Sequence, residues 1–185
     1  MLKKEVSREE IENAIKGKGE YIQIDYLTKV ISGGPHILIK NYAYSKLAEI
    51  YEKKNMFGDV GKTYESLALN SINVQDKINN FMKAAEAYIK DVSFERADVA
   101  LRKAMTEANE SQRVNLYVSL KEAYKNYAKH CEKDMKRAQA VKVYEKLLMM
   151  RITENEKKEI TQRLLDLYEK LGKYKERSLL EKRKY

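Results

Sequence analysis

Apolar residues recur along this chain at the three- and four-residue spacing of an amphipathic α-helix, and the same pattern returns five times. In each copy a large apolar residue serves as an anchor, and a second apolar residue precedes it by four positions. The anchors, in chain order, are Ile15, Tyr51, Tyr88, Tyr124 and Tyr168. Successive anchors are 36, 37, 36 and 44 positions apart, a period typical of stacked helical hairpins. We therefore predict an all-α protein, an α-solenoid of about five antiparallel helical hairpins that forms a single domain over residues 1–185.

Capping and turn residues divide the chain into five repeats. Capping boxes begin the first and last repeats, where Ser7 pairs with Glu10 and Thr153 with Glu156. Ser93 is a predicted N-terminal cap inside the third repeat. The predicted helices of the second and third repeats cover residues 38–53, 57–70, 74–91 and 94–108. The predicted repeats cover about residues 7–32, 37–71, 74–108, 111–150 and 153–184.

The fourth repeat is seven residues longer than the third. Seven residues are close to two helical turns, so we predict that the first helix of this repeat exceeds its neighbours by two turns. Apolar residues continue the helical stripe beyond the anchor Tyr124, at Tyr127, Ala128, Cys131 and Met135. The extra length is therefore expected after the anchor.

The composition supports a helical protein and shows an uneven charge. The 185 residues include only seven Gly and one Pro, so helix-breaking positions are few. The formal net charge is +9, of which residues 1–92 contribute +1 and residues 93–185 contribute +8. Such asymmetry favours an acidic partner for the C-terminal half, although a solubilising surface explains it equally.

Cysteine usage and the charged beginning of the chain point to a cytoplasmic protein. Cys131 is the only cysteine, so the chain forms no internal disulfide, as expected in a reducing compartment. The first twelve residues are rich in charge and contain no apolar stretch suited to a signal peptide. No apolar run approaches the roughly 20 residues of a membrane-spanning helix.

The order of residue types within each repeat resembles the tetratricopeptide repeat. That family places a large apolar residue, a small residue and an aromatic residue in the first helix of each repeat, as in Leu47-Ala48-Tyr51 and Ala84-Ala85-Tyr88. The spacing here exceeds the usual 34 residues of the family. The longer repeats look like those of divergent relatives such as the soluble attachment proteins of vesicle fusion. The resemblance implies a right-handed superhelix with a concave face that binds peptides or proteins.

A basic ridge is predicted on the long helix of the fourth repeat. Lysines are spaced by four positions at Lys121, Lys125, Lys129 and Lys133, and Lys136 and Arg137 continue the charge. Like charges four positions apart destabilise a helix slightly, so a partner that neutralises them is expected. The alternative is a solvated surface with compensating pairs, such as Glu132 with Lys136. The ridge consists of Lys121, Lys125, Lys129, Lys133, Lys136 and Arg137.

A second candidate site follows from the resemblance. The position two residues before each anchor faces the concave groove in the tetratricopeptide family, and here it is mostly acidic. These groove candidates are Asn13, Glu49, Glu86, Glu122 and Asp166. An acidic column suits a basic or helical ligand segment and argues against a site for a peptide carboxylate. The alternative is helix stabilisation by pairs such as Glu49 with Lys53.

Other suggestive patterns have simpler explanations. Residues 58–63 contain a Gly-Lys-Thr fragment, but the glycine that a phosphate-binding loop needs is replaced by Met56. His130 and Cys131 do not share a helix face, so no metal site is expected. Stacking of nucleic-acid bases on Tyr42, Tyr44 or Tyr127 is a weaker alternative.

These observations favour a non-catalytic scaffold or adaptor that binds another protein, through a peptide, a helix or an acidic surface. No catalytic set, metal or cofactor is expected. Two alternatives stay open: a nucleic-acid-binding protein that uses the basic C-terminal half, and a regulatory subunit of an enzyme complex. The sequence predicts neither the oligomeric state nor the identity of the partner.

Overall fold

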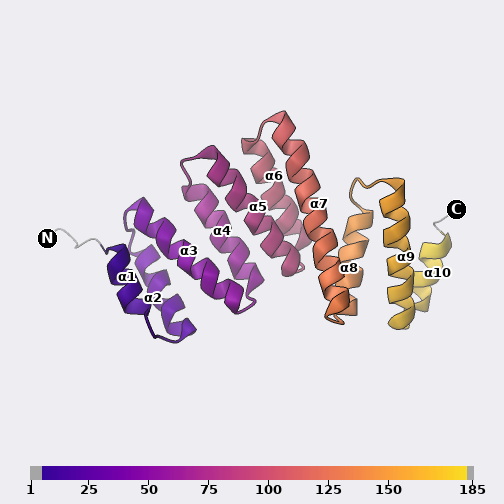
Figure 1. The fold of residues 1–185 in the computed structure, drawn as a ribbon, viewed down its shortest axis with the longest axis horizontal. Coiled ribbons are helices and arrows are strands. Elements are labelled where there is room, and N and C mark those ends of the chain that lie inside the picture. Colours follow the sequence, from indigo (N-terminus) through magenta and orange to yellow (C-terminus); the bar gives the residue numbers. More distant parts are fainter. Residues whose placement is uncertain (1–5, 183–185) are drawn as a thin grey trace. The chain divides into compact units, whose positions relative to one another are not determined.

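The computed structural model describes residues 6–182, and these residues contain ten α-helices (Figure 1). The all-α prediction is confirmed, and the four helices predicted for residues 38–108 begin and end within one residue of the expected positions. The helices are α1 (Arg8–Ile15), α2 (Glu20–Ser32), α3 (Ile37–Lys53), α4 (Phe57–Asn70), α5 (Val74–Lys90), α6 (Phe94–Glu107), α7 (Glu110–Lys133), α8 (Arg137–Leu148), α9 (Glu154–Lys170) and α10 (Tyr174–Lys182).

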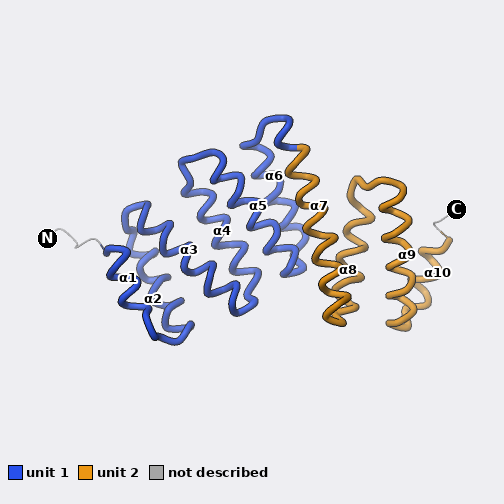
Figure 2. Tube along the Cα trace, viewed as in Figure 1, with its two compact units in different colours: residues 1–113 blue, residues 114–185 orange. Residues whose placement is uncertain are grey.

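The chain divides into two compact units, residues 1–113 and residues 114–185, which we call unit 1 and unit 2 (Figure 2). In unit 1 each helix from α2 to α5 packs against the helix that follows it, and α1 contacts both α2 and α3. In unit 2 helix α9 packs against both α8 and α10. Contacts between neighbours in the sequence therefore dominate each unit, as expected of a helical repeat.

Helix α5 forms much of the interior of unit 1. Its buried side chains recur at helical spacing and include Ile78, Phe81, Ala85, Tyr88 and Ile89. Small residues are buried on the neighbouring helix α6 as well, at Ala97, Ala100 and Ala104. A Cβ atom at Gly61 of α4 would lie only 2.4 Å from the Tyr88 ring, so the glycine allows the ring to pack against the α4 backbone.

The predicted anchors are buried to different degrees. Tyr88, Tyr124 and Tyr168 are buried, and so is Ile15, whereas Tyr51 is only half-buried. Helix α10 contains no buried residue among those described.

Both predicted capping boxes are present. Ser7 accepts a hydrogen bond from the Glu10 amide, Thr153 accepts one from the Glu156 amide, and each glutamate returns a bond to the cap backbone. Ser93 occupies the predicted N-cap position of α6, but its side chain makes no capping bond and instead donates to the Asp91 carboxylate at 2.6 Å.

One type of turn closes four of the helices. The last turn of each helix is followed by a residue with φ near +60°, and the next amide donates to the carbonyl five positions earlier, which is a Schellman motif. The positive-φ residues are Asn55, Val92, Met135 and Gly172. The amide-to-carbonyl bonds of 2.8 to 2.9 Å run from Met56 to Tyr51, Ser93 to Tyr88, Lys136 to Cys131 and Lys173 to Tyr168.

These turns reveal that the second half of the chain repeats the first at an interval of 80 positions. The turn at Asn55 recurs at Met135, and the turn at Val92 recurs at Gly172. Helices α4, α5 and α6 begin at residues 57, 74 and 94, and helices α8, α9 and α10 begin at residues 137, 154 and 174. The block α3–α6 therefore corresponds, helix by helix, to the block α7–α10.

Hydrogen bonds between tyrosine and glutamate side chains recur at the same interval. Tyr64 of α4 donates to Glu52 of α3 at 3.3 Å, and 80 positions later Tyr144 donates to Glu132 at 2.5 Å. In the next helix pair, Tyr88 donates to Glu65 at 2.8 Å and Tyr168 donates to Glu145 at 2.7 Å. Each bond joins two consecutive helices, so the repeat preserves side-chain contacts as well as the backbone.

Helix α7 has 24 residues, whereas α3, α5 and α9 have 17 each, which confirms the predicted excess of seven. Measured from Tyr124, the excess follows the anchor as predicted, because α7 continues to Lys133 whereas α3, α5 and α9 end two residues after their anchors. Comparison of α7 with α3 at the 80-position interval gives a different alignment. The turn that follows α7 is built on Cys131, so Cys131 and not Tyr124 occupies the position of Tyr51. The additional two turns therefore lie at the beginning of α7. Tyr124 is buried one heptad earlier on the same helix, which is why both residues fit the apolar stripe.

Candidate functional site

A polar groove in unit 1 runs along α3, α4 and α5. It consists of two adjoining hollows, of about 200 and about 490 Å³, which share Tyr64 of α4 and Lys83 of α5 in their walls. The smaller hollow also has Glu52 of α3 and Glu86 of α5 in its wall, and the larger has Glu49 of α3. The sequence places these polar residues on helices that pack in succession, so side chains from three helices reach one groove.

Tyr64 lies at the centre of the groove. Its hydroxyl donates to Glu52, and burial together with the charges of Glu52, Glu49 and Glu86 raises its pKa to about 12. The Lys83 ammonium group lies 5.3 Å from the centre of the Tyr64 ring, a cation–π contact. An aromatic face beside three carboxylates is an environment suited to positive charge.

The Glu86 carboxyl has a raised pKa. Partial burial raises it, and the positive charges of Lys90 and Lys83 act in the opposite direction. Lys90 itself lies 5.4 Å from the centre of the Phe57 ring, on the wall of the smaller hollow. Each lysine of this hollow thus lies over an aromatic ring, beside carboxylates that line the same space.

The larger hollow is rich in amide side chains. Asn41 of α3 and Asn79 and Asn80 of α5 line it, together with Asp76. Asn80 donates to the Ser71 hydroxyl at 3.2 Å. The Oδ1 atom of Asn41 is buried and has no hydrogen-bond partner in the described part of the chain. A buried acceptor without a donor destabilises the folded state.

The groove brings together two of the five predicted groove candidates. Glu49 and Glu86 line its two hollows. Asn13 is exposed on α1, Glu122 accepts from Lys125 at 2.9 Å and Asp166 accepts from Gln162 at 3.0 Å. The pairing expected for Glu49 also differs, because its carboxylate lies 3.7 Å from Lys46. Tyr64, Glu52 and Lys83 were not predicted as members of this groove.

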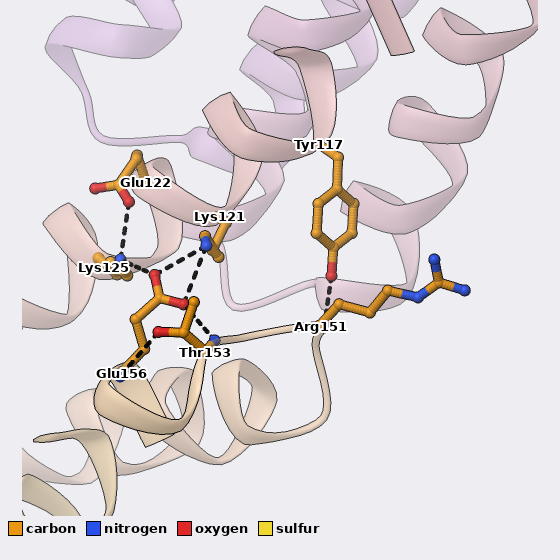
Figure 3. A network of polar contacts seen from close by, with 7 residues as sticks. All are labelled: Tyr117, Lys121, Glu122, Lys125, Arg151, Thr153 and Glu156. Atoms are coloured by element: carbon orange, nitrogen blue, oxygen red, sulfur yellow. Dashed lines mark hydrogen bonds and ion pairs between the residues drawn. The ribbon is translucent and has the colours of Figure 1, made fainter. Parts of the chain in front are cut away.

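The first two lysines of the predicted ridge are engaged inside unit 2 (Figure 3). The Glu156 carboxylate lies 2.8 Å from the Lys121 ammonium group and 2.5 Å from that of Lys125. The two lysine side chains are only 14% and 21% exposed. Hydrogen bonds from Lys121, Lys125 and the Thr153 backbone lower the Glu156 pKa to about 2. These lysines therefore hold the beginning of α9 against α7.

A second contact supports the same junction. The backbone amide of Arg151 donates to the Tyr117 hydroxyl at 2.7 Å, just before the capping box of α9 (Figure 3). The Glu156 side chain also accepts from the Thr153 amide at 2.7 Å. One carboxylate thus caps its own helix and binds two lysines of another.

The remaining ridge residues have different surroundings. Lys129 and Lys133 are exposed on α7, Lys136 lies 3.0 Å from Asp134, and Arg137 is half-buried at the beginning of α8. The expected pair of Glu132 with Lys136 is wrong. Glu132 accepts from Tyr144 and lies 3.7 Å from Arg163. Lys136 lies beyond the end of α7, so helical i, i+4 geometry does not apply to it.

The structure also shows the surroundings of the Gly-Lys-Thr fragment, of the His130-Cys131 pair and of Tyr42. Residues 58–63 lie within α4, where the Thr63 hydroxyl donates to the Asp59 carbonyl at 2.8 Å. Cys131 is buried, and burial raises the pKa of its thiol, while His130 is exposed. The Tyr42 hydroxyl donates to Glu12, and Arg8 and Lys46 lie over its ring at 5.3 and 5.6 Å.

Searches of residues 6–182 for metal-binding clusters and membrane-spanning helices gave negative results. No group of three His, Cys, Asp or Glu side chains in this range has the arrangement needed for a metal ion. Within the same residues, no helix combines the length and the apolar character needed to cross a bilayer. Comparison with known proteins found no matching family model, no matching curated protein and no matching solved structure.

Proposed function

We propose that this chain is a non-catalytic adaptor that binds another protein through the groove of unit 1. We further propose that its helical hairpins form a right-handed α-solenoid of the tetratricopeptide type. The packing of consecutive helices and the recurrence of one turn, at intervals of 37, 43 and 37 positions, support this architecture. The basic composition and single cysteine support the prediction of a cytoplasmic location.

The groove is the observation that carries the proposal. Its two hollows adjoin each other and combine an aromatic ring with carboxylate, amide and ammonium groups. An elongated groove with convergent polar groups suits an extended or helical segment of a partner better than a small molecule. Side chains from α3, α4 and α5 line it, so consecutive helices present one binding surface.

The chemistry of the groove favours binding over catalysis. A nucleophile requires activation by a neighbouring base or by a lowered pKa. The Tyr64 hydroxyl instead has a pKa raised to about 12, and it donates its hydrogen bond to a carboxylate. The glutamates and lysines around it present charged groups that can pair with opposite charges of a bound partner.

The exposed lysines of unit 2 provide a second proposed contact. Lys129 and Lys133 lie on the exposed face of α7, and residues 114–185 contain 19 Lys and Arg against 11 Asp and Glu, a net charge of +8. Positive charge of this density attracts an acidic surface of the same partner. The contact uses these two lysines, because Lys121 and Lys125 are bound to Glu156.

A pull-down with the full chain tests the proposal. Lysate of the source organism is divided into nuclease-treated and untreated halves, and the captured proteins are identified by mass spectrometry. We expect one discrete protein to be captured in both halves, and its capture to weaken for the variant K129E/K133E. Loss of all captured material after nuclease treatment would assign the chain to nucleic-acid binding instead. Capture of an enzyme whose activity requires the chain would assign a regulatory subunit.

A further inference from the structure

The internal repeat makes it possible to compare the groove of unit 1 with its counterpart in unit 2. At an interval of 80 positions, Glu52, Tyr64 and Lys83 correspond to Glu132, Tyr144 and Arg163. In unit 2 the Tyr144 hydroxyl donates to one oxygen of Glu132, and the Arg163 guanidinium lies 3.7 Å from the other. The second copy thus places an arginine beside the glutamate that accepts from tyrosine.

The first copy differs at one position. Lysine replaces arginine at residue 83, and its ammonium group lies over the Tyr64 ring, 5.3 Å from the ring centre. Within residues 6–182, the Glu52 carboxylate forms no ion pair and accepts only the Tyr64 hydroxyl, at 3.3 Å. The smaller hollow of about 200 Å³ lies at this place, bounded by Glu52, Glu86 and Tyr64. A carboxylate that binds arginine in one copy therefore faces open space in the other.

We propose that the smaller hollow binds an arginine side chain of the partner protein, with its guanidinium group between Glu52 and Glu86 beside the Tyr64 ring. This inference rests on the proposed protein-binding function. A guanidinium group donates five N–H bonds, forms bidentate pairs with carboxylates and stacks on aromatic rings. The hollow offers two carboxylates and a ring, and the counterpart of one of these carboxylates in unit 2, Glu132, lies 3.7 Å from Arg163.

The charge and polarity of the neighbouring hollow fit the backbone of the same segment. Four carboxylates, from Glu49, Glu52, Asp76 and Glu86, line the groove against two ammonium groups, from Lys83 and Lys90. The groove is therefore acidic within a chain whose net charge is +9. Asn41, Asn79 and Asn80 in the wall of the larger hollow provide side-chain amide groups for the backbone of the bound segment.

The test uses a minimal probe, N-acetyl-arginine methylamide, titrated into the isotopically labelled full chain and followed by amide chemical shifts. Citrulline methylamide, acetylated in the same way, is the neutral control probe. We expect saturable shifts confined to amides of the groove with the arginine probe, and none with the citrulline probe. Because the chain is strongly cationic, general electrostatics disfavours the arginine probe elsewhere. Absence of these shifts, or equal shifts with both probes, would overturn the inference.

The variants E52Q/E86Q and K83R change the groove, and E95Q/E110Q is the control. E52Q/E86Q removes the two carboxylates and should weaken binding about tenfold or more. E95Q/E110Q removes the same charge at exposed positions of α6 and α7 and should leave binding unchanged. K83R keeps the charge and introduces the side chain that unit 2 has at residue 163. We expect its guanidinium to occupy the site beside Glu52 and to compete with the probe. Full binding by K83R would contradict the inference even if E52Q/E86Q fails to fold.

The pull-down separates this inference from the function on which it rests. If the wild-type chain captures no protein, the proposed function is wrong. If the wild-type chain and K83R capture the same protein equally well, the adaptor function stands and the arginine site is wrong. Capture by the wild-type chain and by E95Q/E110Q, but weakly by K83R, supports both.

Discussion

The Tyr88 hydroxyl donates a 2.8 Å hydrogen bond to the Glu65 carboxylate, and the Lys103 ammonium group lies 2.7 Å from the other oxygen of the same carboxylate. One glutamate of α4 is thus bound by side chains of both α5 and α6. The tyrosine–glutamate bond recurs 80 positions later between Tyr168 and Glu145, at 2.7 Å. Contacts of this kind explain how consecutive helices keep a fixed pairing although α5 presents many small residues to its neighbours.

Replacement of Tyr88 by phenylalanine tests the contribution of this bond. The change removes the donor to a charged acceptor and leaves the ring in place, so we expect the free energy of unfolding to fall by about 1.5 kcal/mol. Urea denaturation followed by circular dichroism measures the difference. Tyr174→Phe is the control, because Tyr174 is exposed and its loss of a hydroxyl should change stability by less than about 0.5 kcal/mol. Equal effects of the two changes would contradict the role of the Tyr88 bond.

Stability should depend on pH through Glu156. Its pKa in the folded chain is about 2, below the ordinary value of 4.5, so ionised Glu156 stabilises the folded state. This contribution is complete above pH 4.5 and is lost as the pH falls toward 2. Glu156→Gln keeps a residue able to form the capping box and removes the charge.

We therefore expect Glu156→Gln to lower the melting temperature at pH 7 and to match the wild-type chain near pH 2. Thermal unfolding at pH 7, 5, 3 and 2 gives the comparison. Glu154→Gln is the matched control, since Glu154 is exposed in the same first turn of α9. A difference between Glu156→Gln and wild type that stays constant from pH 7 to 2 would exclude the ion pairs as its cause.

The turn residues Val92 and Gly172, both with positive φ, predict substitutions with opposite effects on the free energy of unfolding. Val92 has φ of 60°, a conformation that is unfavourable for a β-branched side chain, and its counterpart 80 positions later is Gly172 with φ of 67°. Val92→Gly should raise the free energy of unfolding by about 0.5–1 kcal/mol, after the entropy cost of glycine is subtracted. Gly172→Val should lower it. Denaturation midpoints measure both changes, and a stabilised Gly172→Val variant would refute the explanation by backbone strain.

Gly61 provides a test of packing in unit 1. Alanine at this position would place a Cβ atom 2.4 Å from the Tyr88 ring, so we expect a loss of about 1–3 kcal/mol in spite of the better helix propensity of alanine. Gly58→Ala in the same helix meets only the Asp91 carboxylate, at 3.1 Å, which is able to move. The control should therefore be neutral or stabilising. Denaturation of the two variants in parallel decides whether the ring contact or helix propensity dominates.

The periodic apolar pattern was sufficient to predict most helices, because it reports which face of each helix is buried. The capping boxes at Ser7 and Thr153 were also predictable, since their partners lie three residues away. The N-cap position of Ser93 was predictable as well, but the capping bond was not, because the Asp91 carboxylate accepts from its hydroxyl. A local motif is predicted well when no nearby side chain offers a stronger partner.

The groove was harder to predict, since its residues come from three helices. Glu49 and Glu86 were identified through their spacing from the anchors, whereas Tyr64 and Glu52 were not. A signal for the missing residues exists in the chain: the dipeptide Tyr-Glu recurs at residues 51, 64, 144 and 168. Glu52 accepts from Tyr64, 12 positions later, and Glu65 accepts from Tyr88, 23 positions later. Helical periodicity alone does not reveal these separations.

The basic ridge shows the limit of charge patterns. The spacing of four residues correctly places Lys121, Lys125, Lys129 and Lys133 on one helix, α7. It does not reveal Glu156, which arrives from α9 and binds the first two lysines. The fourth anchor was assigned to Tyr124 for a related reason: residues one heptad apart lie on the same face, and only the turn after Cys131 distinguishes them.

The turn that recurs after α3 and α7 makes the chain divisible into interchangeable blocks. Met56 and Lys136 occupy the same place in that turn, so a chain that passed from Met56 directly to Arg137 would retain the junction. Tyr144 would then follow Glu52 by 12 positions, the separation that now joins Tyr64 to Glu52. Excision or insertion of 80 residues at this junction would therefore shorten or lengthen the protein by four helices. The side chains that pair across the new junction would still be a tyrosine donor and a glutamate acceptor.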